Sequence, residues 1–173
     1  MSDTVLTAPG IFSAALGLIQ TAASTYSSPP PTVFPFELGQ YEPAVYITVH
    51  DISPVSLVAE DTSYGFQEHY DLEGECVYWT GTGVSDSPTV TTDAMTATWA
   101  LYQACVMTPM VSHRTIPILG YSASASGSPG PYQMLLRSAT YTARPGMDAK
   151  GTPWGWTGII AWQFHFDALL YPA

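Results

Sequence analysis

Residues 68–79 read EHYDLEGECVYW, and this stretch decides how the rest of the chain is interpreted. Asp71, Glu73 and Glu75 recur at every second position. Apolar residues fill most of the alternate positions, at Tyr70, Leu72, Cys76 and Tyr78. Because successive side chains of a strand point to opposite faces, we predict a β-strand with its carboxylates on one face. Such a row of like charges can be a catalytic pair, part of a metal site, a solvated face or a surface that repels a polyanion.

The length, the apolar fraction and the net charge of the chain indicate one folded domain that does not wrap nucleic acid. A length of 173 residues fits a single domain, 1–173, with its own core, and 46% apolar residues exclude a disordered chain. The net charge of −10 arises because only four residues are Lys or Arg. Nucleic-acid binding requires clustered basic residues, so this class is disfavoured. A surface past which DNA slides without binding stays possible.

The low charge and the high aromatic content predict a protein that binds other molecules. Charged residues make up only 10% of the chain, which contains five Trp and eleven Tyr. Aromatic residues are enriched and charges depleted in the cores of protein interfaces. A subunit of a permanent assembly is therefore expected, and a carbohydrate-binding module, also rich in Trp and Tyr, is the competing interpretation.

The cysteine positions and the first residues of the chain favour assembly in a cytoplasm. Cys76 and Cys105 occupy buried-type positions, so two reduced core thiols are favoured over a disulfide. The first residues, MSDTVLTAPG, lack the basic region of a secretory signal. No window approaches the ~20 apolar residues of a membrane span. No membrane association is expected.

The first half of the chain is predicted to form a helix, a linker and a β-hairpin. Residues 8–24 place apolar side chains at helical spacing. The proline run within residues 27–36 favours an extended linker. The β-branched residues 44–52 indicate a strand, and residues 53–66 are expected to be the loop that leads to the strand 68–79.

The middle of the chain is predicted to be a helix followed by a long loop. Thr92 and Asp93 supply N-cap chemistry for a helix over residues 93–107, and Pro109 is expected to end it. Residues 108–131 are rich in Ser, Gly and Pro. Loops of this length in a compact domain tend to be functional or to dock onto a neighbour.

The last part of the chain is predicted to be a second hairpin, of strands 132–144 and 157–170. In the final strand, Gln163, His165 and Asp167 alternate with apolar residues and therefore share a face. The element order is helix, hairpin, helix, hairpin. This order predicts an α+β domain with an antiparallel sheet of about four main strands and two helices packed on one face.

The carboxylate row gives weak support for an enzyme. Neighbours two apart on one strand face lie roughly 6.6 Å apart, which overlaps the carboxyl separation of inverting glycosidases. Exposed strand faces often carry Asp and Glu for solubility, so a solvated or lumen-facing row is favoured. The segment GYSASAS, residues 120–126, lacks the second glycine of a nucleophile elbow. No phosphate-binding loop occurs, so we predict no catalytic or cofactor-binding residue and no enzyme.

The histidines do not predict a metal centre. The four histidines are His50, His69, His113 and His165. His165 shares a strand face with Asp167, and His69 shares one with Asp71. Neither pair reaches the three or four ligands of a zinc site, so no metal is expected.

The arrangement of elements resembles a known family. A helix, a proline-bearing linker, a strand ending in His-Asp (50–51), an acid-bearing strand and a second helix precede a last strand with the pattern W-x-F-x-F-D (162–167). This order resembles the tail terminator (tail completion) proteins of long-tailed bacteriophages. The correspondence covers the chain from about Pro9 to Leu170, and it has no diagnostic short motif.

The resemblance implies a structural role in the virion. Proteins of this family form a hexameric ring at the head-proximal end of the tail tube, at the junction of tail and neck. The ring ends tube polymerisation and binds the head-completion (stopper) protein, while DNA passes through its lumen. The implied partners are further copies of the chain, the tail tube protein and the head-completion protein, and assembly takes place in the host cytoplasm.

Two sets of candidate residues follow. Asp71, Glu73 and Glu75 are expected to face the lumen, where a repeated negative charge would repel the DNA backbone. The interface candidates are the aromatic residues of the later loops and hairpin, Tyr121, Tyr132, Trp154 and Trp156. The long insert at residues 108–131 and the loop PGMDAKGTPWGW depart from the family layout, and they leave open which loops meet the tube and which meet the head.

The alternatives make different structural predictions. Another head–tail connector or a tail tube subunit is the nearest rival, and a tube subunit should contain more strand and less helix. A carbohydrate-binding module should be a β-sandwich of many short strands. A hydrolase should lose its turnover when Glu73 and Glu75 are replaced together.

Overall fold

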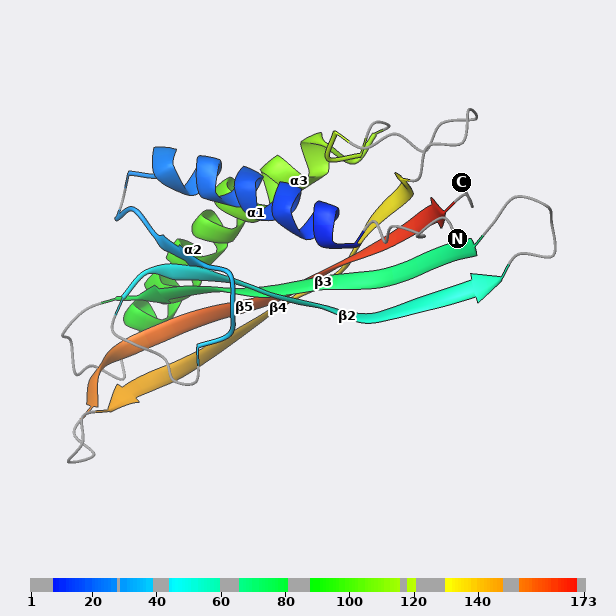
Figure 1. The fold of residues 1–173 in the computed structure, drawn as a ribbon. Coiled ribbons are helices and arrows are strands. Elements are labelled where there is room, and N and C mark those ends of the chain that lie inside the picture. The colour runs from blue at the N-terminus through cyan, green and yellow to red at the C-terminus, as the bar shows by residue number, and fades with distance from the viewer. Residues whose placement is uncertain are drawn as a thin grey trace.

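The computed structural model describes residues 8–27, 29–38, 44–59, 66–80, 88–115, 118–120, 130–147 and 153–170. The helices are α1 (Ala8–Thr25), α2 (Pro88–Tyr102), a π-helical segment η1 (Gln103–Met107) and α3 (Thr108–Ser112). The strands are β1 (Thr32–Phe34), β2 (Tyr46–Ala59), β3 (Phe66–Trp79), β4 (Gly130–Met147) and β5 (Pro153–Leu170). Figure 1 shows α1, α2 and α3 together on one side of the sheet.

The strands form one five-stranded sheet in the order β1-β2-β3-β5-β4. The four long strands pair in antiparallel fashion, whereas β1 pairs parallel to β2. The α+β class is therefore confirmed, and the wholly antiparallel sheet of four strands is confirmed only in part, because the sheet is mixed. The short β1 lies within the predicted linker 27–36, where no local pattern indicated a strand.

The first hairpin is longer than predicted. The expected loop 53–66 is wrong over most of its length, because β2 continues to Ala59 and β3 begins at Phe66. Pro54 lies inside β2. It is tolerated there because β1 pairs only with the segment Tyr46–Thr48, so the remainder of β2 has one side free of a strand partner among the described residues. Register shifts between β2 and β3 occur between Val49 and Ile52 and between Ser53 and Ser56, and Pro54 lies within the second.

The second helical region begins earlier and ends later than predicted. The helix α2 starts at Pro88, a residue suited to the first helical turn, so the expected N-cap at Thr92 and Asp93 is wrong. The expected stop at Pro109 is also wrong. The chain stays helical through η1, and Pro109 occupies the first turn of α3, where its missing N–H costs no hydrogen bond.

The core lies between the helices and one face of the sheet. The apolar stripe predicted for the first helix (Ile11, Phe12, Ala15, Leu18, Ile19 and Ala22) faces this core. Ile11, Ala15 and Ile19 are buried, the other three are partly buried, and Ala8 and Ala23 extend the buried stripe of α1. On this face, the largest fully buried side chains of the sheet are Tyr70, Trp162, Phe164 and Phe166. Tyr46 belongs to a second, smaller cluster with Val77 and Ile159, which the register places on the opposite face of the sheet. Both predicted hairpins thus contribute to one buried layer.

One carboxyl group and two thiols are enclosed in this core. Glu68 is fully buried, and its Oε1 accepts a hydrogen bond of 3.3 Å from the N–H of Ala8 at the start of α1, where a carboxylate is favourable. Cys76 and Cys105 are buried free thiols, as predicted. Burial raises the pKa of Cys105 to about 11 and the pKa of Cys76 well above its usual value, so both act as small apolar residues at neutral pH.

Among the described helices, none combines the length and the apolar character needed to cross a bilayer.

Candidate functional site

The two faces of β3 differ in chemistry, as the sequence predicts. Tyr70 and Leu72 are buried beneath the helices, while Asp71, Glu73 and Glu75 are partly exposed on the opposite face. This second surface is called the open face below, since the described helices all lie on the other side of the sheet (Figure 1). The shared face of the three carboxylates is therefore confirmed.

The open face of β5 supplies partners for these carboxylates. The antiparallel register places Asp71 opposite His165 and Glu73 opposite Gln163. The Nδ1 atom of His165 lies 2.6 Å from Oδ1 of Asp71. The Nε2 of Gln163 donates to Asp71 Oδ2 at 3.2 Å and to Glu73 Oε1 at 2.8 Å. One amide therefore bridges two neighbouring acids.

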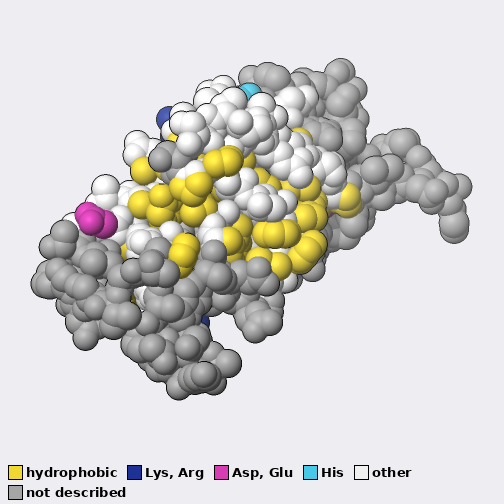
Figure 2. Space-filling view, turned by 90° about the vertical axis from the view of Figure 1, so that its left-hand side faces the viewer, with side chains coloured by type: hydrophobic (Ala, Val, Ile, Leu, Met, Phe, Trp, Pro, Cys, Tyr) yellow, Lys and Arg dark blue, Asp and Glu magenta, His cyan; other side chains and the backbone are white. Residues whose placement is uncertain are grey.

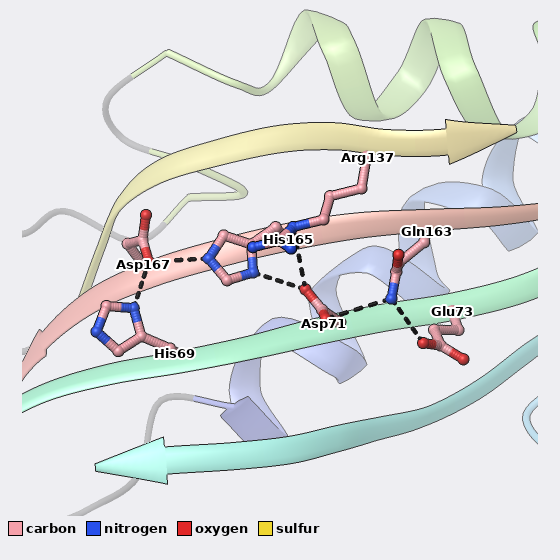
Figure 3. Close-up of polar contacts among 7 residues, drawn as sticks. All are labelled: His69, Asp71, Glu73, Arg137, Gln163, His165 and Asp167. Atoms are coloured by element: carbon pink, nitrogen blue, oxygen red, sulfur yellow. Dashed lines mark hydrogen bonds and ion pairs between the residues drawn. The ribbon is translucent and has the colours of Figure 1, made fainter. Parts of the chain in front are cut away.

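A second pair continues the network along the same strands. His69 lies opposite Asp167, and its Nδ1 is 2.5 Å from Asp167 Oδ1. The same oxygen lies 3.0 Å from Nε2 of His165. Figure 3 shows these side chains as one chain of polar contacts running along β3 and β5.

A basic side chain reaches the network from the edge strand. Arg137 of β4 places its Nε 3.8 Å from Oδ1 of Asp71. A register shift between β4 and β5 lies at this residue, between Leu136 and Ser138, so Arg137 is an extra residue in its strand. Its side chain is 52% exposed, and this ion pair therefore contributes little to stability.

Polar and basic partners thus offset part of the repulsion within the carboxylate row. Asp71 has three partners, and Glu73 has the Gln163 amide. A polar hollow of about 420 Å³ lies beside them and is lined by Glu37, His50, Glu73 and Glu75 among others. The negative charge of the open face is concentrated around this hollow.

The predicted interface residues are only partly described. Tyr121 lies outside the described residues. The backbones of Tyr132 and Trp154 lie in β4 and β5, and their side chains are outside the described part of the structure. Trp156 is half-buried in β5, and its carbonyl oxygen accepts hydrogen bonds of 3.0 Å from the N–H and the hydroxyl of Thr80.

An apolar surface lies at the end of the molecule where β2 begins and β3 ends. Figure 2 views this end and shows hydrophobic side chains gathered across its centre, with few charged groups among them. A pocket of about 610 Å³ there is lined by Val45, Tyr78, Trp79 and Ala97, among others. This surface is called the apolar end below.

The grouping of His69, His165 and Asp167 was missed by the sequence reasoning. Each strand was seen to carry one histidine and one aspartate on a face, but the two predicted hairpins were not expected to join through β3 and β5. The register joins them and brings one possible ligand atom of each residue within 4.8 Å of the others.

Comparisons with known proteins give no family. No family model matches this chain, and no curated protein is significantly similar to it.

The shared amide of Gln163 gives a first prediction. Replacing Gln163 with methionine keeps the volume and removes the donor from two carboxylates on one strand face. We expect a loss of about 1–2 kcal/mol in the free energy of unfolding, because hydrogen bonds to charged groups are the stronger ones. The loss should shrink in high salt, which screens the Asp71–Glu73 repulsion.

Urea denaturation at low and high salt measures this loss. The matched control is Gln20→Met on the exposed side of α1, which should change stability by less than about 0.5 kcal/mol. Equal stability of the two variants would show that Gln163 does not hold the carboxylates together.

Proposed function

We propose that this protein is a structural subunit of the tail-terminator class. Its copies would close into a ring, hexameric as in that family, at the head-proximal end of a phage tail tube. The ring would end tube polymerisation and join the tail to the head-completion protein in the virion. The observation that carries the proposal is the long edge strand β4 with exposed leucines, beside an acidic open face, in a subunit whose element order resembles that of the family.

The edge strand supports assembly. Among the described residues, β4 pairs only with β5, so its other side presents unpaired backbone groups. Leu135 and Leu136 of this strand are 48% and 43% exposed. Exposed apolar side chains on such an edge favour association with another chain, because association removes them from water.

A second, different surface supports a ring in particular. The pocket of the apolar end is lined by residues of β3 and the adjoining Thr80, of α2 and of the segments before β1 and β2, with none of its lining residues from β4. Met95 and Trp99 of α2 are further exposed apolar side chains. A closed ring is built from heterologous contacts, in which each subunit offers two different patches. Two separate apolar surfaces on one chain fit this requirement better than a single self-complementary patch.

The open face fits a DNA-conducting lumen. Asp71, Glu73 and Glu75 share this face, and the chain has a net charge of −10. Repetition of such a surface around a ring would produce a negative wall that repels phosphates and lets DNA pass without binding. The hydrogen bonds from Gln163 hold two of these carboxylates in place.

The rival classes receive less support. A carbohydrate-binding module was expected to be a β-sandwich, whereas the described strands form one sheet covered by helices. A tail tube subunit was expected to contain less helix than α1 and α2 provide. Asp71 is engaged with Gln163, His165 and Arg137, and Glu73 with Gln163, so neither offers a hydrolase an acid without a partner.

Mass in solution tests the proposal. Light scattering over a range of concentrations should give a hexamer for the wild-type chain, or a monomer that becomes a ring as concentration rises. Leu136→Lys should remain a monomer where the wild type is a ring, because a charge would be buried in the contact. Gln20→Lys, on the exposed side of α1, is the control and should assemble normally.

The proposal would be contradicted if the wild-type chain showed neither self-assembly nor capping of tail tubes. That result is a chain that is monomeric at every concentration and caps no tubes in electron micrographs when it is mixed with its tail tube protein.

A further inference from the structure

Two adjacent cross-strand pairs on the open face combine two histidines with two aspartates. The motif His-x-Asp occurs at residues 69–71 of β3 and again at residues 165–167 of β5. Because the strands are antiparallel, His69 lies opposite Asp167 and Asp71 lies opposite His165. All four side chains lie on the same face of two strands in the middle of the sheet. Regular strands hold such groups more precisely than loops do.

Two ring nitrogens converge on one carboxylate oxygen. Oδ1 of Asp167 lies 2.5 Å from Nδ1 of His69 and 3.0 Å from Nε2 of His165. The two rings are stacked, with centroids 6.2 Å apart and planes within 9° of parallel. The possible ligand atoms of His69, His165 and Asp167 all lie within 4.8 Å of one another. Two imidazole nitrogens and one carboxylate oxygen are a donor set that Zn²⁺ takes in proteins.

The two ring nitrogens of His165 face two different carboxylates. Its Nδ1 faces Asp71 Oδ1 at 2.6 Å, and its Nε2 faces Asp167 Oδ1. A neutral imidazole has one N–H and one lone pair, so it can donate to only one of these carboxylates. If Nδ1–H donates to Asp71, the lone pair of Nε2 faces a second carboxylate, and a cation between them turns this contact from repulsive to attractive.

Asp71 would then be an outer partner, that is, a residue that contacts a metal ligand and not the metal itself. Histidine ligands of metals commonly donate their other N–H to a carboxylate, which fixes the tautomer and the ring orientation. The contact between Asp71 and His165 has this form. Gln163 and Arg137 in turn contact Asp71, so the outer partner is itself held in place.

We propose that His69, His165 and Asp167 bind one divalent transition-metal ion of the Zn²⁺ type. The ligand atoms are Nδ1 of His69, Nε2 of His165 and Oδ1 of Asp167, and Asp71 orients His165. The side chains of the three ligands are 28%, 14% and 13% exposed, so an ion can reach them from solvent. Three protein ligands leave a fourth position for water or a ligand from a partner. This inference replaces the expectation that the chain holds no metal, and it does not depend on ring formation.

The test is a competition titration on the full chain without a histidine tag. The protein is titrated with Zn²⁺ against a chromophoric chelator, and with Co²⁺, whose visible absorption reports nitrogen and oxygen ligation directly. We expect one ion per chain. His165→Gln and Asp167→Asn should each weaken Zn²⁺ binding by about 100-fold or more, and Asp71→Asn should weaken it about 10-fold to 100-fold, the effect typical of an outer partner.

The control is His113→Gln, an exposed histidine in a different part of the chain, and it should bind as tightly as the wild type. If the ligand variants fail to fold, His69→Gln at the most exposed ligand and the Co²⁺ spectrum of the wild type decide the question. The proposal is overturned if the wild type does not compete for Zn²⁺ and gives no Co²⁺ absorption, or if His69→Gln binds as tightly as the control. The three side chains would then form a hydrogen-bonded cluster without a metal.

Discussion

Replacing Gly74 with alanine is expected to destabilise the protein by about 3 kcal/mol or more. A Cβ atom at this position would overlap both the backbone carbonyl oxygen of Thr48 on β2 and the ring of Trp162 on β5. Overpacking of a tight core costs about 1–3 kcal/mol, and more when a neighbour has no room to move. The Thr48 oxygen belongs to the sheet backbone, so no change of rotamer relieves the overlap. The sheet itself would have to shift.

The free energy of unfolding from urea titrations measures this effect. Gly17→Ala in α1 is the matched control, because a Cβ there meets no heavy atom within 4 Å. It should be neutral or stabilising by about 0.5–1 kcal/mol, since alanine favours the helix over glycine. Equal stability of Gly74→Ala and wild type would mean that β2, β3 and β5 are not packed as described here.

Phe164→Ala is expected to cost about 3–5 kcal/mol, the usual range for removing a buried aromatic side chain. Phe164 is fully buried in the middle of β5, and its ring meets Trp162 edge to face at a centroid distance of 5.9 Å. The cavity would open in the layer between the sheet and the helices, where the backbone of β5 is fixed by β3 and β4 and cannot close it.

The same substitution at an exposed phenylalanine provides the control for this cavity. Phe36 is 53% exposed and lies near Phe34. Phe36→Ala should lose about 1 kcal/mol at most, which corresponds to one partly exposed aromatic contact. Similar losses for the two variants, measured at the same protein concentration, would contradict the assignment of Phe164 to the core.

The faces of the strands could be predicted because they depend on a local period. The alternation in residues 68–79 and 157–170 placed the carboxylates and Gln163, His165 and Asp167 on the correct side of their strands. Strand pairing is not local. The predicted hairpins joined β2 to β3 and β4 to β5, but the central contact between β3 and β5 links residues far apart in sequence. The repeated His-x-Asp motif was the available signal, since antiparallel pairing sets each histidine opposite an aspartate.

The boundaries of the second helical region could not be predicted for a different reason. Thr92 and Asp93 have good cap chemistry, but the helix begins at Pro88 and includes them. Pro109 usually stops a helix, and here the π-helical segment before it lets a new helical turn begin at Thr108. In both places tertiary packing overrides local preference. The short β1 is a similar case, since only its pairing with β2 makes it a strand.

The irregular edge of β4 has a consequence for the behaviour of the protein at high concentration. Register shifts occur between Pro131 and Gln133, between Leu136 and Ser138, and between Gly146 and Met147. Pro131 and Pro145 also lack the N–H that a neighbouring strand would use. Amyloid growth needs a flat strand with evenly spaced backbone groups, and this edge is even only over residues 138–144. The protein should therefore resist conversion to fibrils during storage although its edge strand is long.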